Sequence, residues 1–182
     1  LALETQAKVK LFKKHLYRLA KDKGPLFKTQ KAIAHPEDRI LLKKAVEACP
    51  LLGETSDGKQ IYLYQYQQSS PVLREIGRLR EIAFRAVGEG SGQRRDIDQY
   101  DSYYEQLILW DQDDLEIVGA YRFANTAKVM AEKGLAGLYT ASLFQFNPQM
   151  TPYLDQGLEL GRSFVQPRYW GKRSLDYLWY GI

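Results

Sequence analysis

The sequence contains little cysteine and histidine and no long apolar run. Its single cysteine, Cys49, cannot form an internal disulfide, and one cysteine with two histidines is too few for a Cys/His zinc site. No run reaches the roughly 18 apolar residues of a membrane-spanning helix, and no charged-then-apolar export leader begins at Leu1. The sequence therefore predicts a protein of the reducing cytoplasm that holds no metal through cysteine and histidine.

Several catalytic signatures are also missing. The chain has no Gly-Xaa-Ser-Xaa-Gly elbow, no Walker loop and no His-Glu-Xaa-Xaa-His sequence. Both histidines, His15 and His35, lie in the basic N-terminal region, so a Ser-His triad is not expected. These absences argue against hydrolases and nucleotide-binding enzymes that use those motifs.

Positive charge is concentrated at one end of the chain. Residues 1–48 contain 12 Lys and Arg against 5 Asp and Glu, whereas the remaining residues contain 14 against 17. The split predicts a basic arm, residues 1–48, attached to a near-neutral folded domain, residues 49–182. Such an arm is suited to an anionic partner: a membrane surface, a nucleic acid or an acidic protein. At 182 residues and 45% hydrophobic content, one main core is expected.

The basic arm has the pattern of an amphipathic helix. Apolar residues recur every three or four positions within residues 1–20, with lysines and an arginine between them. A helix of this kind can lie on an anionic bilayer, or it can be a solvated helix docked on the rest of the protein. Residues 21–36 are predicted to be a connector, and residues 37–48 a short helix that ends at Cys49-Pro50.

After residue 50, strand and helix patterns follow in mixed order. The expected elements are strands over residues 60–66, 106–110, 116–123 and 158–165, helices over 72–87, 126–133 and 172–182, and a short helical or irregular segment over 148–157. This order is neither a strict β-α-β alternation nor an all-β pattern, so it predicts an α+β fold. The chain starts without Met, and its last predicted helix reaches residue 182 without a stop signal, so a piece of a longer protein is expected.

The stretch from Glu159 to Leu175 contains a candidate phosphate site. A predicted strand there runs into a bend, a glycine-bearing turn and the start of a helix. Such turns offer unpaired backbone N–H groups to a phosphate, and neighbouring cations add charge. The candidate residues are Arg168, Gly171, Lys172 and Arg173. One glycine is not a phosphate fingerprint, so an ordinary basic turn is the alternative.

Charged residues on and near the predicted strands are candidates for an amine site. Glu159 and Arg162 are three positions apart on one strand, so their side chains are expected on opposite faces. A buried carboxylate needs a partner, so Glu159 is either functional or paired with Arg122. A second group of carboxylates follows a glycine-rich loop and consists of Asp96, Asp98 and Asp101. These can hold a cationic amine, although on position alone a polar loop is the commoner explanation.

From about residue 70 to the end, the chain resembles the Gcn5-related N-acyltransferase (GNAT) superfamily. Within it, the chain is similar to the branch of bacterial ornithine-lipid N-acyltransferases and acyl-homoserine-lactone synthases. The blocks that carry the resemblance are residues 73–84, 98–101, 119–122, 142–146 and 158–165. Residues 41–66 and 159–182 look most like the C-terminal half of bacterial proteins called hemolysins. That likeness would make residues 1–48 an interdomain tail.

The resemblance implies a twisted mixed sheet flanked by helices, incomplete at its C-terminal end, with residues 158–165 as a central strand. The pantetheine arm of an acyl donor would pair with the backbone at Phe164, Val165 and Gln166, and the phosphate would lie at Arg168, Gly171, Lys172 and Arg173. Only Gly171 survives from the usual Gln/Arg-Xaa-Xaa-Gly-Xaa-Gly/Ala motif. Acyl carrier protein is therefore the expected donor in preference to coenzyme A, with no tightly bound cofactor.

The same resemblance assigns an acceptor side. Arg80, Phe84, Asp98, Asp101 and Arg122 match positions that bind the amine acceptor, and Glu159 and Arg162 match the catalytic positions. An amino acid needs carboxylates for its ammonium group and an arginine for its carboxylate. The implied reaction is attack of a neutral amine on a thioester carbonyl, with Glu159 as the expected base and the Val165 N–H as the expected oxyanion donor.

The expected function is transfer of a fatty or 3-hydroxy fatty acyl group from acyl carrier protein, or from coenzyme A, to the α-amine of ornithine or a similar amino acid. The expected location is the inner face of the cytoplasmic membrane, reached through residues 1–48. An acyl-homoserine-lactone-type signal synthase and a non-catalytic binding module are the alternatives, and nucleic acid is not an expected partner. An open sheet edge would also permit strand swapping in a homodimer.

Overall fold

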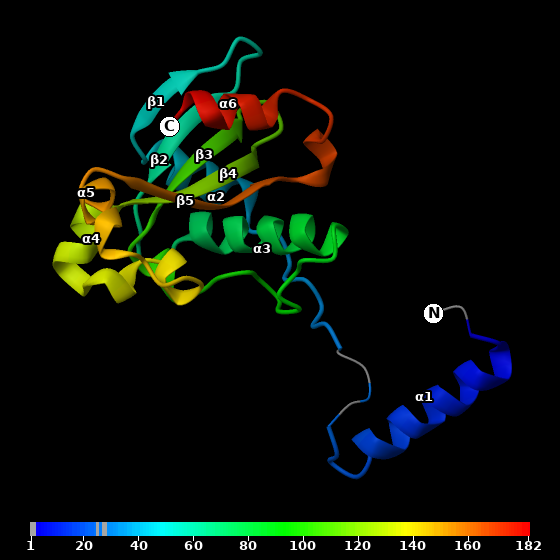
Figure 1. Ribbon diagram of the computed structural model, residues 1–182. Helices are drawn as coiled ribbons and strands as arrows, with labels where there is room; N and C mark the ends of the chain where they lie inside the picture. Colours follow the sequence, from blue (N-terminus) through cyan, green and yellow to red (C-terminus); the bar gives the residue numbers. More distant parts are fainter. Residues whose placement is uncertain (1–2, 25, 27–28) are drawn as a thin grey trace. The chain divides into compact units, whose positions relative to one another are not determined.

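The computed structural model describes residues 3–24, 26 and 29–182 (Figure 1). The chain divides into two compact units, Leu1–Ala32 and Ile33–Ile182. Residues 1–2 of the first predicted helix, and residues 25, 27 and 28 of the predicted connector, lie outside the described residues. Among the described helices, none combines the length and the apolar content needed to span a bilayer.

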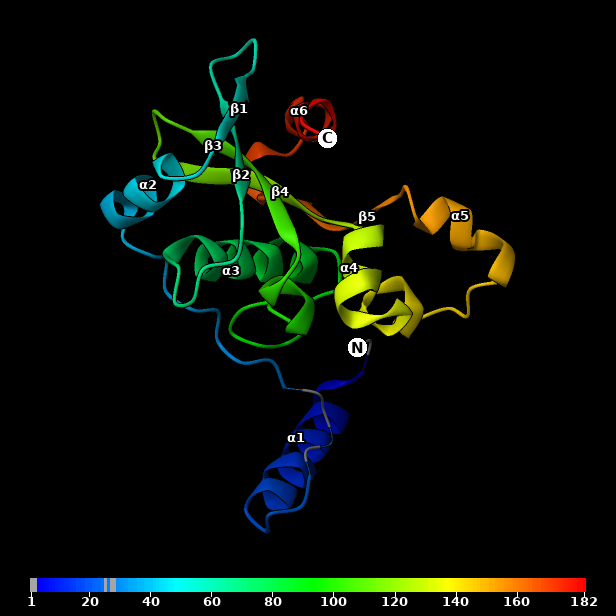
Figure 2. The same ribbon diagram turned by 90° about the vertical axis from the view of Figure 1, so that its left-hand side faces the viewer.

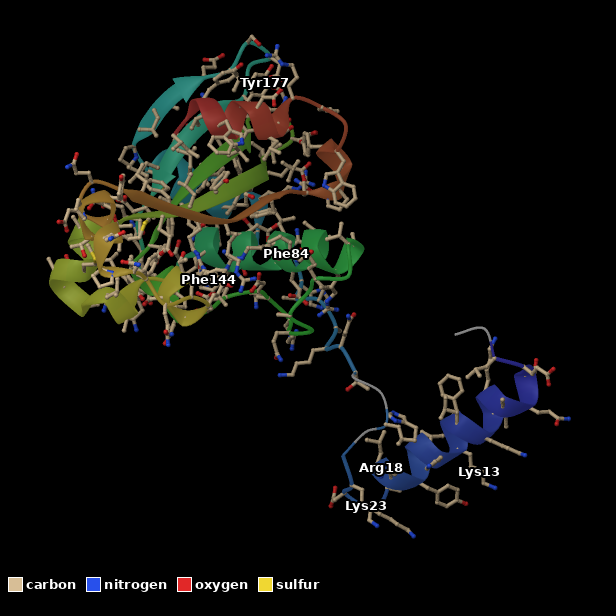
Figure 3. The ribbon with its side chains drawn as sticks, in the orientation of Figure 1. Lys13, Arg18, Lys23, Phe84, Phe144 and Tyr177 are labelled. Carbon is tan, nitrogen blue, oxygen red and sulfur yellow. The ribbon has the colours of Figure 1, made fainter. Side chains whose placement is uncertain are left out.

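The described residues of the first unit form one helix, α1 (Thr5–Leu19), which confirms the predicted amphipathic helix. Figure 3 shows Lys13 and Arg18 on this helix. Its apolar side chains are exposed: Val9 is 61% and Leu16 is 62% accessible to solvent. In the last turn of the helix, the Arg18 guanidinium donates a hydrogen bond at 2.9 Å to the carbonyl of Gly24, which follows the helix. The unit therefore carries a basic helix with an uncovered apolar stripe.

The second unit begins before the boundary expected from the charge pattern. Helix α2 (Arg39–Glu47), which the charge pattern assigned to the arm, belongs to the folded domain. Its N-terminus is capped by Asp38, whose carboxylate accepts from the backbone N–H groups of Ile40 and Leu41 at 3.0 and 2.9 Å. Leu42 and Val46 are buried in the main core, because burial of the apolar face outweighs the basic charge of the exposed face.

A five-stranded sheet forms the centre of this unit. Its strands are β1 (Leu51–Glu54), β2 (Gln60–Tyr64), β3 (Glu105–Asp111), β4 (Glu116–Asn125) and β5 (Leu158–Val165). They lie in sequence order and each pairs with its neighbour antiparallel. The GNAT-type α+β sheet is thus present, but its described pairings are all antiparallel and β5 is at the edge. The reason is that α4 and α5 return the chain to the end of β4, where Leu158 faces Asn125.

Helices cover both faces of the sheet (Figures 1 and 2). On one face, α2 and α3 (Pro71–Ala86) pack on alternate residues of the strands, including Tyr62, Ile108 and Trp110. On the other face, α6 (Ser174–Tyr180) packs on the intervening residues, such as Leu107 and Leu109. This alternation follows from the two-residue period of a strand. A third cluster lies under α4 (Thr126–Lys133) and α5 (Thr151–Leu154).

The contact between β4 and β5 depends on a glycine. A Cβ atom at Gly119 would lie 2.4 Å from the carbonyl oxygen of Phe164 and 3.2 Å from the Cα of Val165. Both neighbours are backbone atoms of β5, so neither can move without moving the strand. Only a hydrogen at this position allows β5 to approach β4 so closely.

We therefore expect Gly119→Ala to lower the free energy of unfolding by about 1–3 kcal/mol, the usual cost of overpacking a core. Gly161→Ala is a matched control on β5, since a Cβ atom there would meet no atom within 4 Å. Urea unfolding of both variants would measure the difference. Equal stability of the two variants would contradict the close approach of β5.

Candidate active site

Three charged side chains are fully buried between α3 and the sheet. Arg80 of α3 is 0% exposed, and Asp101 and Arg122 are each 1% exposed. Arg80 Nη2 lies 2.7 Å from Asp101 Oδ2, and Arg122 Nη1 lies 3.2 Å from Asp101 Oδ1. The Gln106 side chain adds a hydrogen bond to Asp101 Oδ1 at 3.0 Å. A charge can be buried at this depth only because it is paired and hydrogen-bonded.

Three further charged residues extend this group toward solvent. Asp96 Oδ2 lies 3.2 Å from both Arg80 Nε and Arg162 Nη1, and Asp98 Oδ1 lies 2.6 Å from Arg122 Nη1. Arg162 Nη2 is 3.7 Å from Asp98 Oδ2. The carboxylate cluster of the sequence is thus not a solvated polar loop. It forms an Arg–Asp network of balanced charge, made of Arg80, Arg122, Arg162, Asp96, Asp98 and Asp101.

The turn that carries two of these carboxylates is built by the carboxylates themselves. Asp98 Oδ1 accepts from the backbone N–H of Tyr100 at 2.9 Å and from that of Asp101 at 3.3 Å. In return, Asp101 Oδ2 accepts from the backbone N–H of Asp98 at 2.9 Å. This reciprocal capping box fixes the 3₁₀ turn Gln99–Ser102. It therefore determines where Asp98 and Asp101 face the arginines.

Aromatic rings surround the arginines of the network. The Arg122 guanidinium lies 5.3–5.7 Å from the ring centres of Tyr100, Tyr104 and Tyr139. The Arg162 guanidinium lies 5.7 Å from the Tyr139 ring and 5.9 Å from Phe84, which Figure 3 shows on α3. Cation–π contacts stabilise a cation that is held away from water. Phe84 was predicted at this site. The three tyrosines were missed, because tyrosines within strand and helix patterns are explained equally well by packing in the core.

The Glu159 carboxylate is fully engaged by hydrogen-bond donors. It accepts from the backbone N–H of Tyr139 at 3.1 Å and from that of Thr140 at 2.6 Å. The hydroxyls of Tyr104 and Thr140 donate to it as well. Burial and the bond to Glu159 together raise the pKa of Tyr104. Glu159 thus joins β5 to the turn at residues 139–140, whose tyrosine ring contacts both Arg122 and Arg162.

The prediction that Glu159 and Arg162 leave opposite faces of the strand is wrong. Arg162 has a φ of +49°, and the pairing of β4 with β5 shifts register between Ala120 and Arg122. This bulge breaks the two-residue alternation, because it inserts an extra residue on β5. As a result, both side chains reach Tyr139 from the same side of the strand.

Not every polar group in the network has a partner. Within the described residues, three buried atoms accept or donate no hydrogen bond: Asp98 Oδ2, Gln106 Oε1 and Arg162 Nε. Asp98 and Arg162 are also the least buried members, with side chains 25% and 28% exposed. Asp98 and Arg162 therefore form a 3.7 Å ion pair at the less buried side of the network, and each keeps one atom that makes no hydrogen bond. A carboxylate beside a guanidinium is the pair of charges that a small zwitterion would complement.

A pocket of about 380 Å³ lies at the other end of β5. Its walls are Ser163, Phe164, Val165, Tyr169, Trp170, Gly171, Lys172 and Leu175. Four of these, Phe164, Val165, Gly171 and Lys172, were predicted to bind the acyl donor. Gly171 has a φ of +74°, which allows the tight turn before α6. The carbonyl of Val165 accepts from the indole of Trp170 at 2.7 Å, which holds that ring beside the strand.

Three other predicted donor-binding residues have different surroundings. The backbone N–H of Gln166 donates to Val118 at 2.9 Å, and its side chain donates to Ile117 at 2.6 Å. Gln166 therefore extends the pairing with β4 and is not free to pair with a pantetheine arm. The Arg168 guanidinium pairs with Asp114 and Glu116, so it does not face the pocket. The third residue, Arg173, lines a separate pocket with Tyr177 and Tyr180.

The fold and these sites agree with a comparison against known families. The sequence model of the family described as "Acetyltransferase (GNAT) domain" matches residues 79–180, more than half of the chain. The chain belongs to the GNAT family of acyltransferases. The matched residues run from α3 through α6 and so include the Arg–Asp network, Glu159 and the pocket at Lys172.

Several curated proteins are similar to this GNAT chain. A glycine N(alpha)-acyltransferase of Bacteroides thetaiotaomicron is 41% identical over 163 residues, which are 82% of this chain and 48% of that protein. An L-ornithine N(alpha)-acyltransferase of Agrobacterium fabrum is 31% identical over 109 residues, 57% of this chain and 36% of that protein. The chain thus spans about half the length, or less, of these curated relatives. No solved structure matches the chain.

The buried carboxylates of the GNAT domain should make its free energy of unfolding depend on pH in the acid range. Burial works to raise the pKa of Asp101, but the Arg80 and Arg122 guanidinium groups outweigh burial and lower it. Burial raises the pKa of Asp96 instead. A lowered folded pKa means that the stability contributed by Asp101 is complete above its unfolded pKa of about 3.9. That stability is lost as the pH falls from there through the folded value.

We expect the difference in unfolding free energy between the natural protein and Asp101→Asn to shrink as the pH is lowered below about 4, by up to about 1.4 kcal/mol per pH unit. Denaturant unfolding between pH 3 and pH 7 would measure it. Asp96 is present in both proteins, but Asp101 is one cause of its raised pKa, so the opposite effect of Asp96 cancels only in part. A difference that stays constant over this range would contradict the lowered pKa.

Proposed function

We propose that the full-length protein transfers an acyl group from a thioester donor to the α-amino group of a small amino acid, with glycine as the first candidate and ornithine as the second. The observation that carries the proposal is the Arg–Asp network, whose two least buried members, Asp98 and Arg162, are a carboxylate and a guanidinium 3.7 Å apart, each with one atom that makes no hydrogen bond. The names of the relatives point to the same reaction class, since all describe acyl transfer to an α-amine.

The acceptor would bind as a zwitterion. Its ammonium group would bind Asp98 and its carboxylate would bind Arg162, where a charge-assisted hydrogen bond is strongest. Ornithine carries a second ammonium, which needs another carboxylate. The three carboxylates of the network are matched by three arginines, so none is in excess for a second positive charge, and the network favours an acceptor with one positive charge. The higher identity to the glycine N(alpha)-acyltransferase supports this order of candidates.

The donor would lie along β5 with its phosphate near Lys172 and Gly171. GNAT enzymes take the acyl group from a thioester such as acyl-CoA. Arg168 pairs with two carboxylates and Arg173 lines another pocket, so one of the three predicted cations, Lys172, remains at the pocket. One cation suits the single phosphate of a carrier protein better than the three phosphates of coenzyme A. Acyl carrier protein is therefore the proposed donor.

The chemistry requires the amine to lose a proton before it attacks the thioester carbonyl. The bound ammonium first gives one proton to a base or water. The neutral amine then attacks, the C–N bond forms and the C–S bond breaks, a second proton goes to the leaving thiolate, and the third stays on the amide nitrogen. Glu159 lies at the boundary of the network and holds the turn that supports both arginines. Its four hydrogen-bond donors fit a role in positioning this turn, while a role as the base would require one donor to be displaced.

The proposed site of action is the cytoplasmic face of an anionic membrane. The basic, apolar-striped helix α1 supports this, because lysines bind anionic lipid and exposed apolar side chains enter the interface. Sedimentation with vesicles of phosphatidylglycerol, compared with phosphatidylcholine, would test it. Binding that does not depend on the anionic lipid would contradict it.

The experiment that tests the function is mass spectrometry of products from the full-length protein. It would be incubated with 3-hydroxyacyl carrier protein or the matching acyl-CoA, and with glycine, ornithine, lysine, glutamine and S-adenosylmethionine together. The expected product is N-acylglycine from the carrier-protein donor. If N-acylornithine forms instead, ornithine becomes the first candidate acceptor. If an acyl-homoserine lactone forms, the protein is a signal synthase. If no acceptor is modified, a non-catalytic binding module becomes the better description.

A further inference from the structure

A second pocket opens at the start of β5. Of its lining residues, only Glu159 and Thr140 belong to the site described above. Its volume is about 340 Å³. The walls come from α4, α5, the turns between them and the first residues of β5: Thr126, Leu138, Thr140, Phe146, Tyr153, Leu154, Gly157, Leu158, Glu159 and Leu160. Most of this surface is aliphatic or aromatic, so the chemistry of the lining favours an apolar occupant.

Three polar side chains in the wall, Thr126, Thr140 and Glu159, already have hydrogen-bond partners. Glu159 accepts from both the N–H and the hydroxyl of Thr140. The Thr126 hydroxyl lies against the carbonyls of Leu154 and Gly157, at 2.9 Å from the latter. None of the buried unmatched atoms of the described residues belongs to this pocket. A polar ligand would therefore have to break existing hydrogen bonds, whereas an aliphatic chain would not.

The adjoining surface is apolar as well. Phe146 also lines a neighbouring pocket of about 540 Å³ together with Leu135, Ala136, Ala141, Phe144 and Gln145. Phe144, visible in Figure 3 on the segment between α4 and α5, is 65% exposed. Exposed apolar surface of this extent around a pocket is typical of a site that receives an apolar ligand. The two pockets share Phe146 as a lining residue, so they are neighbours.

Strand β5 connects this apolar pocket with the pocket at Lys172. Residues 158–160 line the first and residues 163–165 line the second. At about 3.3 Å per residue, Leu160 and Ser163 are about 10 Å apart along the strand. Arg162, with its bulge, lies in this interval, beside the Arg–Asp network. A linear ligand along β5 would thus pass from a cationic end, past the network, to an apolar end.

We propose that the pocket between α4, α5 and the start of β5 binds the aliphatic chain of the acyl donor. The proposal rests on the proposed function, and it adds the place where the acyl chain binds and a preference of this pocket for long, unbranched chains. In this arrangement the thioester carbonyl lies near Arg162, the amino acid approaches from the network, and Glu159 separates the charged side from the apolar side.

The test narrows the pocket and measures chain-length preference. In the full-length protein, Leu154→Trp should reduce the kcat/KM ratio of C16 over C8 acyl donors at least about tenfold, since each methylene displaced from an apolar site lowers affinity about fourfold. Activity with the C8 donor should stay within about twofold. Leu143→Trp is the matched control, because Leu143 is 59% exposed and does not line the pocket. Phe146→Ala, which widens the pocket, should shift the preference to longer chains.

A binding measurement tests the pocket independently of the reaction. Titration calorimetry with C8, C12 and C16 fatty acids should show affinity that rises with chain length in the natural protein and rises less in Leu154→Trp. If no acceptor is acylated but affinity still depends on chain length in this way, the proposed function is wrong and the assignment of the pocket to an aliphatic chain is kept. If turnover occurs and both Leu154→Trp and Phe146→Ala keep the natural chain-length profile, the pocket assignment is overturned and the function stands.

Discussion

Replacing Glu159 with glutamine is expected to lower the kcat of the full-length protein by at least about 100-fold, the lower range for loss of an acid–base group or of active-site geometry. The carboxylate accepts from four donors, two backbone N–H groups and two hydroxyls. A glutamine offers one oxygen and one NH2 group, so its NH2 would face donors. The turn at Tyr139 would then be released, and the support that its ring gives to Arg122 and Arg162 would be lost.

The matched control for this substitution is Glu132→Gln on α4. Glu132 is exposed and lies away from β5 in the sequence, so its loss should change kcat by less than twofold. Thiol release from the donor and the mass of the acylated product would measure both variants. Activity of Glu159→Gln close to that of the natural protein would remove support for Glu159 as part of the site. That result would favour the alternative that the domain is a binding module, which does not need the Glu159 carboxylate.

A second pair of variants separates two roles for Glu159. Tyr104→Phe and Thr140→Val each remove a hydroxyl donor but leave the carboxylate in place. If Glu159 positions the turn, these variants should lower kcat without changing the shape of its pH profile. If Glu159 is the base, these variants should keep or raise kcat, because one donor must be displaced before the carboxylate can take a proton.

Replacing Arg80 with alanine is expected to lower the free energy of unfolding by about 3–5 kcal/mol, the usual cost of removing one partner of a buried ion pair. Arg80 is 0% exposed and contacts Asp101 at 2.7 Å and Asp96 at 3.2 Å. Without it, two buried carboxylates share the remaining guanidinium groups. This loss is large compared with the total stability of a domain of this size.

Arg94→Ala is the control for this variant, because Arg94 is exposed on the same loop as Asp96 and has no ion pair among the described contacts. Its effect should lie within about 0.5 kcal/mol. Guanidinium chloride unfolding at pH 7 would measure both variants. Equal stability of Arg80→Ala and Arg94→Ala would mean that the network is not formed in solution as described.

Local sequence pattern predicted most of the elements. The helix α4 and the strand β5 have the predicted bounds, and the hairpin of β3 and β4 flanks the acidic turn at Asp111 as expected. These features depend on side-chain periodicity and turn residues, which act between neighbours in the sequence. The first strand, β1, was missed because its four residues are largely exposed and carry no alternating pattern.

The resemblance supplied the site residues, but their partners came from the tertiary structure. Arg80 and Asp101 are 21 positions apart, and Arg162 and Asp96 are 66 apart. Which of several carboxylates an arginine contacts depends on the packing of α3 against the sheet, which no local pattern encodes. The same applies to Arg168, whose role as a phosphate ligand was predicted from the turn but whose guanidinium pairs with Asp114 and Glu116.

The sequence by itself determined the α+β class, the basic character of the N-terminal region and the order of most elements, and its resemblance to a family supplied the candidate site residues. The tertiary structure alone decided that the carboxylates are buried with arginines, that a bulge turns Arg162 to the side of Glu159, and that an apolar pocket lies at the start of β5. The reason is physical: periodicity is a property of adjacent residues, whereas burial and charge pairing arise only where distant segments come together.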